Sequence, residues 1–111
     1  MPISEFGAVV MQAAAVAIGV GTALDLSGLP SATLQIKGIT TATVTFEATV
    51  NGTDWVGVAL ANLNSTTRAR ALTATADGIF LFEAAPGTQA LRANITAWTS
   101  GATTITGVAG R

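Results

Sequence analysis

The carboxylates are the side chains of this sequence that could do catalytic chemistry, because it contains no histidine and no cysteine. Histidine is the commonest general base and the usual partner of a nucleophile, so most hydrolytic mechanisms are excluded. Two carboxylates can still hydrolyse a glycosidic bond. The candidates for such a pair are Glu47, Asp54, Asp77 and Glu83. Asp54 and Asp77 stand in turn-forming sequences and Glu47 stands among threonines, so we expect structural roles and no enzymatic activity.

Metal and phosphate sites are not indicated either. A calcium loop needs several oxygen ligands close together, and the six acids of this chain are scattered. Gly19-Val20-Gly21 lacks the rest of a dinucleotide-binding fingerprint and a following helix. We therefore expect no metal and no cofactor.

Two indoles are the candidates for ligand binding, since an exposed tryptophan face can stack on a sugar ring. Trp55 begins an expected strand, and Trp98 precedes an expected turn. Tryptophans in such places more often cap a core or fill a subunit contact. We favour a structural role for both and keep glycan stacking as the alternative.

The surface implied by the composition is unusually neutral. Only 10% of the 111 residues are charged, the net charge is −1, and half of the residues are hydrophobic. So few charges protect a monomer poorly against association. We therefore expect neighbouring copies to cover part of the exterior, and a wet, threonine-rich surface is the alternative.

The five basic residues are balanced by six acids and form no run, so we expect no nucleic-acid partner. Arg68 and Arg70 would share one face of a strand. There they could pair with acidic groups of a neighbouring subunit, although a solvated pair of side chains is the simpler interpretation.

The N-terminal segment is apolar from Ala8 to Val20, apart from Gln12 and Gly19. A signal peptide begins with basic residues, but this chain has none before Lys37. The apolar segment is also shorter than the roughly 20 residues of a membrane-spanning helix. We expect residues 1–12 to form an arm that docks on a neighbour and a single domain to occupy residues 13–111. The first strand would cover residues 13–20, and a short helix is the alternative there.

Alternating apolar and polar residues predict strands along the rest of the chain. The clearest prediction is a hairpin over residues 42–60, with Asn51-Gly52 as a two-residue primed turn. Residues 91–98 and 102–108 are expected to form a second hairpin around Thr99-Ser100-Gly101, with a bulge at Gly107. Residues 79–82 are apolar on both faces, which indicates a strand that is covered on both sides or one whose outer face is a contact surface.

These signals predict an all-β fold, an antiparallel β-sandwich that is jelly-roll-like, with about eight short strands. Turn sequences with Gly, Pro, Asn and Asp separate the expected strands, and no long helix is indicated. No linker or repeat divides the chain.

Residues 44–60 (VTFEATVNGTDWVGVAL) and 77–107 (DGIFLFEAAPGTQALRANITAWTSGATTITG) resemble a pattern found in small bacteriophage virion proteins. In that pattern a strand leads into a turn like NDGTNW, a later strand ends at a PG turn, and the next reads like RVRVTAYTSGTVTVTG. The resemblance covers about residues 42–107, and Trp98 stands where the pattern commonly has tyrosine.

The resemblance implies a β-sandwich structural subunit of a phage head, collar or tail. We expect a capsid decoration or cement protein, made in the cytoplasm of the bacterial host and located on the capsid surface. It would form a homo-oligomer, with a trimer expected, and would bind the major capsid protein or another virion protein, with no membrane partner. The expected interface residues are Phe6, Val9, Val10, Met11, Phe80, Phe82, Arg68 and Arg70. The alternative is a carbohydrate-binding or host-adhesion module of a phage tail, in which Trp55 or Trp98 stacks on a glycan.

Overall fold

The structure is a computed structural model that describes residues 8–26 and 28–110. Within these residues there are nine β-strands in one antiparallel sheet, and there is no helix that could cross a membrane. The strands are β1 (Val9–Ala15), β2 (Leu24–Asp25), β3 (Ser31–Thr49), β4 (Val56–Gly57), β5 (Leu60–Asn62), β6 (Arg70–Ala71), β7 (Thr73–Ala74), β8 (Gly78–Glu83) and β9 (Ala90–Gly110). The predicted all-β, antiparallel fold class is confirmed.

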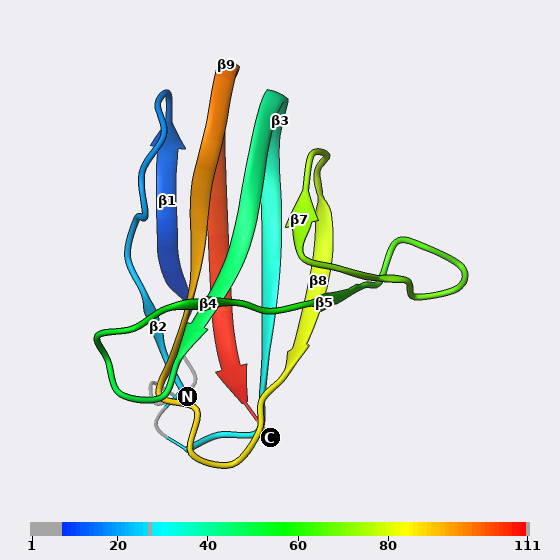
Figure 1. The fold of residues 1–111 in the computed structure, drawn as a ribbon. Coiled ribbons are helices and arrows are strands. Elements are labelled where there is room, and N and C mark those ends of the chain that lie inside the picture. The colour runs from blue at the N-terminus through cyan, green and yellow to red at the C-terminus, as the bar shows by residue number, and fades with distance from the viewer. Residues whose placement is uncertain (1–7, 27, 111) are drawn as a thin grey trace.

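The centre of the sheet is a ladder between two very long strands, β3 with 19 residues and β9 with 21. The ladder begins with Ser31 opposite Gly110 and ends with Thr49 opposite Ala90. In Figure 1 both strands fold back at the upper end of the view, so that the β3–β9 ribbon lies over itself as two layers. The expectation of short strands is therefore wrong for these two elements.

Two glycines allow the ribbon to fold over. The register of the β3–β9 ladder shifts between Lys37 and Val44, and Gly38 and Gly101 lie there with φ angles of 84° and 103°. Both values are in the left-handed region, where a side chain is strained, and a Cβ on Gly38 would collide with the carbonyl oxygen of Ala102. Only glycine fits this bend without displacing the backbone.

The two layers share the long strands. Layer A contains β1, residues 103–110 of β9, residues 31–37 of β3, and the strands β8, β5 and β6. Layer B contains β2, residues 90–98 of β9, residues 42–49 of β3, and the strands β4 and β7.

One apolar core lies between the layers. Phe46 of layer B and Phe80 of layer A meet there, with ring centroids 5.3 Å apart. Side chains of the long strands alternate between this core and the exterior, as the period of two requires. Large core residues that are almost completely buried include Met11, Leu26, Leu34, Ile36, Val44, Phe46, Leu60, Leu91, Ile95 and Ile105.

The expected second hairpin is replaced by the bend in β9. The chain changes direction near Gly101 as predicted, but the segments before and after it pair with β3 and not with each other. Gly107 does not mark a bulge in this ladder: it pairs in register with Leu34, and its backbone faces the core. Val108 faces outward because the alternation of β9 continues without interruption past Gly107.

The hairpin predicted over residues 42–60 is present, with a longer connection. β3 ends at Thr49 and β4 begins at Val56, so the two-residue primed turn is wrong. The side-chain oxygen of Asn51 accepts hydrogen bonds from the backbone N–H groups of Thr53 and Asp54, each at 2.8 Å. This Asx-type cap stabilises a wider loop than Asn-Gly alone would form.

The N-terminal boundary also differs from the prediction. Residues 9–12 were expected in an arm, but they belong to β1, which pairs with β9. The Gln12 side-chain amide is buried and donates hydrogen bonds to the carbonyl oxygens of Gly19 and Ala93. β1 ends at Ala15, before most of the strand expected at residues 13–20. Residues 1–7 of the expected arm lie outside the described residues.

A test of the core packing is the substitution Gly107→Ala. An added Cβ would lie 2.7 Å from both Leu34 Cδ2 and Met11 Sδ, so the core must shift to accept it. We expect a loss of about 1–3 kcal/mol in the free energy of unfolding, measured by urea denaturation. Gly110→Ala is the matched control, because nothing lies within 4 Å of its added Cβ. Equal stability of the two variants would contradict the packing described here.

Candidate functional site

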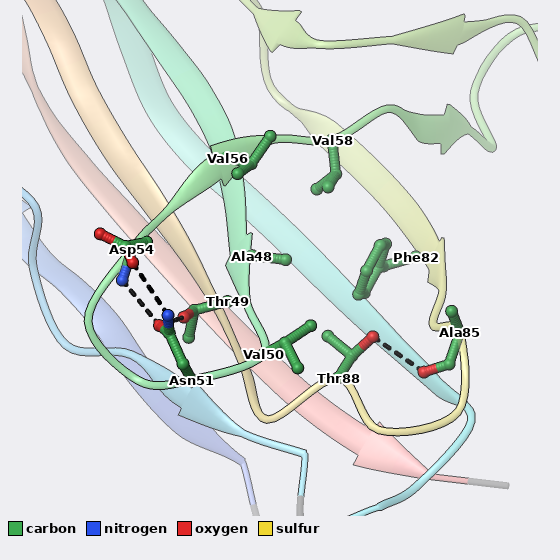
Figure 2. A pocket seen from close by; sticks show the side chains of 10 residues that line it. All are labelled: Ala48, Thr49, Val50, Asn51, Asp54, Val56, Val58, Phe82, Ala85 and Thr88. Carbon is green, nitrogen blue, oxygen red and sulfur yellow. Dashed lines mark hydrogen bonds between the residues drawn. The ribbon is translucent and has the colours of Figure 1, made fainter.

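A groove of about 430 Å³ opens between the end of β3, the strand β4 and the end of β8. Its floor contains the buried side chains of Ala48 and Phe82, and its walls contain the exposed side chains of Val50 and Val56, which are 68% and 66% accessible. Figure 2 shows Ala48, Val50 and Phe82 around a common space, with Val56 on the strand beside it. The complete lining is Ala48, Thr49, Val50, Asn51, Asp54, Val56, Val58, Phe82, Ala85 and Thr88.

The groove exists because β4, at the edge of layer B, does not pair with β8 of layer A, and β8 pairs with β5 only at Phe80 and Leu81. On one side the loop after β3 is held by a hydrogen bond from Asn51 Nδ2 to Asp54 Oδ2, at 2.9 Å. On the other side the turn after β8 is held by Thr88 Oγ1, which donates to the carbonyl oxygen of Ala85 at 2.8 Å. Both walls are therefore built by local turn contacts (Figure 2).

The chemistry of the groove is that of apolar contact. Of its ten lining residues only Asp54 is charged, and this carboxylate already accepts a hydrogen bond from Asn51. The lining has no nucleophile paired with a base. Within residues 8–26 and 28–110 there is also no group of three potential metal ligands. This lining can therefore hold aliphatic or aromatic groups of a partner.

A polar cluster lies on the outer face of layer B. The guanidinium carbon of Arg92 lies 4.3 Å from the centroid of the Trp55 ring. Arg92 Nε donates a hydrogen bond to Glu47 Oε1 at 2.6 Å, and Asn94 Nδ2 lies 3.5 Å from both oxygens of this carboxylate. One face of Trp55 is thus covered, and Glu47 holds the arginine in place.

The remaining candidate residues also have structural partners. The indole N–H of Trp98 donates to the carbonyl oxygen of Gly101 at 3.0 Å, and its ring packs against the core. The carboxylate of Asp77 accepts hydrogen bonds from the backbone N–H groups of Gly38 and Ile39 and so supports the glycine bend. The contacts of both residues fit structural roles.

Several expected interface residues prove to be buried in the monomer. Phe80 and Phe82 point into the core, so the prediction of an exposed contact surface at these two positions is wrong. It is Ile79 and Leu81 that point outward from β8. Met11 is also a core residue and not part of an arm. The reason is the same in each case: the opposite layer covers the face of the strand on which these side chains lie.

The other expected interface residues have mixed positions. Val9 packs against the core, Val10 remains exposed, and Phe6 lies outside the described residues. Arg68 has a φ angle of 51° and precedes β6, so it does not share a strand face with Arg70. Arg70 forms an exposed ion pair with Glu83 of the same chain, with Nη2 and Oε1 2.6 Å apart.

Sequence reasoning did not identify the valines of the groove as a site. Val50 and Val56 flank the Asn51-Gly52 loop and look like ordinary strand residues in the sequence. Their position is the available signal, because two branched apolar residues border a turn in which residues 51–54 are Asn, Gly, Thr and Asp. Only the relative position of β4 and β8 shows that both face open space.

Two solved structures have the same fold. A structure of the SPBc2 prophage-derived protein YomS matches with a TM-score of 0.80 and 14% identity, over 92% of this chain and 90% of that chain. A structure of the PBSX exported protein XepA matches with a TM-score of 0.84 and 16% identity, over 93% of this chain and 37% of that chain. The fold expected from the resemblance to phage proteins is thus found in two phage-derived proteins. Comparisons with protein-family models and with curated protein sequences gave no match.

The polar cluster predicts that Arg92 contributes more to stability than Arg70. The Arg92–Glu47 side chains are only 21% and 17% exposed, whereas the Arg70–Glu83 side chains are 59% and 61% exposed. Arg92→Ala removes a shielded ion pair and the cation–π contact, so we expect a loss of about 1–2 kcal/mol in the free energy of unfolding.

The matched variant Arg70→Ala should change that free energy by less than about 0.5 kcal/mol, because exposed pairs contribute little. Urea denaturation followed by tryptophan fluorescence measures both. If Arg70→Ala proved the more harmful substitution, the structural role assigned to the polar cluster would be wrong.

Proposed function

We propose that this chain is a bacteriophage virion structural protein, a capsid decoration or cement subunit that binds its own copies and a capsid protein. The observation that carries the proposal is the shared fold with two phage-derived proteins, on a chain that is poor in charge and exposes eight large hydrophobic side chains among its described residues. The protein would be made in the host cytoplasm and act on the surface of the head.

The mechanism is the burial of apolar surface. Removing such surface from water yields roughly 25 cal/mol per Å². Several subunits attached together dissociate far more slowly than one, because the remaining contacts keep a released subunit close to its site. A neutral exterior suits this role, since few charges must lose their hydration when subunits meet.

The contacts of the carboxylates support a role without catalysis. Glu47 is bound by Arg92, Asp54 by Asn51, and Glu83 by Arg70, and Asp77 caps backbone N–H groups. Each has a separate structural partner, which is the arrangement expected of a scaffold. We also prefer the structural role to glycan binding, because both indoles already have partners. Trp55 stacks on Arg92, and Trp98 donates a hydrogen bond to Gly101.

The proposal predicts that the protein copurifies with phage particles. Particles from a culture that produces the phage encoding this chain should contain it after density-gradient purification, detected by a specific antibody in many copies per particle. Electron microscopy with antibody-bound gold should label the heads. A host cytoplasmic protein serves as the control for contamination. Presence in the lysate together with absence from purified particles would contradict the proposal.

A further inference from the structure

A row of exposed aliphatic side chains follows β1 along one edge of the molecule. Val16, Ile18 and Val20, which we call the ridge, are 60%, 66% and 45% exposed. The segment is held against β9 by Gly19, whose N–H and C=O both bond to Ile95, at 3.0 and 2.9 Å. Residues on either side of Gly19 therefore point away from the core. In Figure 1 this segment is the blue connection between β1 and β2.

The groove lies at the opposite edge of the same layer. In layer B, Leu24 pairs with Leu91, Leu91 with Ala48, and Ala48 with Val56. This row crosses the layer from β2, next to the ridge segment, to β4, at the wall of the groove. The ridge and the groove are thus separated by the width of layer B and are carried by one rigid ladder.

The ridge is costly to leave in water. No charged residue occurs between Glu5 and Asp25, although natural proteins commonly protect a sheet edge with charges. Among the described residues eight large hydrophobic side chains are exposed, and five of them belong to the ridge or to the groove walls. The exposed apolar surface is therefore concentrated at two places, the exposed side chains of the ridge and the hollow of the groove.

We propose that the ridge of one copy docks in the groove of a second copy of this chain. The two surfaces match in chemistry: the ridge has only aliphatic side chains, and the groove has an apolar floor with a single carboxylate at its rim. A ridge without charge leaves no ionised group unpaired when it is buried in this groove. No partner of another kind is needed to explain why both surfaces occur on one chain.

The contact is head-to-tail, because each copy uses two different surfaces. Such contacts close into rings when the rotation between copies allows it, and they form filaments when it does not. A closed ring is compatible with the trimer expected from the resemblance to phage virion proteins, whereas a twofold pair of ridges would produce a dimer. This inference rests on the self-association in the proposed function and specifies the surfaces that would perform it.

The test uses two charge substitutions in the full chain, Ile18→Asp in the ridge and Val56→Asp in the groove. Each should convert the assembly to monomer, measured by size-exclusion chromatography with light scattering, while circular dichroism still reports folded β structure. Leu72→Asp is the matched control, since Leu72 is 54% exposed and belongs to neither surface. It should assemble like the wild type, and its dissociation to monomer would contradict the assignment of the contact.

A mixture of the two monomeric variants distinguishes head-to-tail docking from other contacts. The Val56→Asp variant keeps an intact ridge, and the Ile18→Asp variant keeps an intact groove. Mixed at equal concentration they should form a heterodimer and nothing larger, because the other two surfaces are both charged. Failure of the mixture to pair, or assembly of either variant alone, would overturn the docking of ridge in groove.

The outcomes separate this inference from the function proposed above. A wild-type chain that stays monomeric at all concentrations tested would overturn the self-association itself. A wild-type oligomer that tolerates both substitutions would overturn only the ridge-and-groove contact. Binding to phage particles is tested separately, by copurification. Neither of these two results therefore decides whether the protein binds to the phage head.

Discussion

The antiparallel ladder between β3 and β9 is the interaction on which the rest of the structure depends. It joins residues 31–49 to residues 90–110, and β1, β2, β4, β7 and β8 all pair directly with one of these two strands. Because the ribbon folds at Gly38 and Gly101, one ladder supplies the middle of both layers. The core, the edges and the groove follow from where this bend lies.

The few charged groups of the chain support this scaffold. Glu47 and Arg92 lie opposite each other in the ladder and position Trp55 on the outer face, while Asp77 binds the backbone at the glycine bend. The ridge contains no charged residue, and Asp54 is the one charged residue of the groove lining. The apolar ridge and groove walls remain exposed, and they are the surfaces that association would bury.

Much of the fold was predictable from local pattern. The alternation around Leu34 and Ile36, around Val44 and Phe46, and along Leu91 to Ile95 correctly predicted strands and the side chains that face inward. The role of β1 was not predictable in this way. Apart from Gln12 its residues are apolar on both faces, so they show no clear alternation that would say whether they join the sheet or extend from it.

The sequence by itself determined the all-β class, the main strand positions and the lack of a histidine or cysteine site, since composition and a period of two are local properties. Only the tertiary structure decided that residues 91–98 and 102–108 are parts of one strand, that Phe80 and Phe82 are covered, and that Val50 and Val56 border a groove. Exposure depends on which distant strand lies across the core. That pairing is non-local, so no pattern within a single segment contains it.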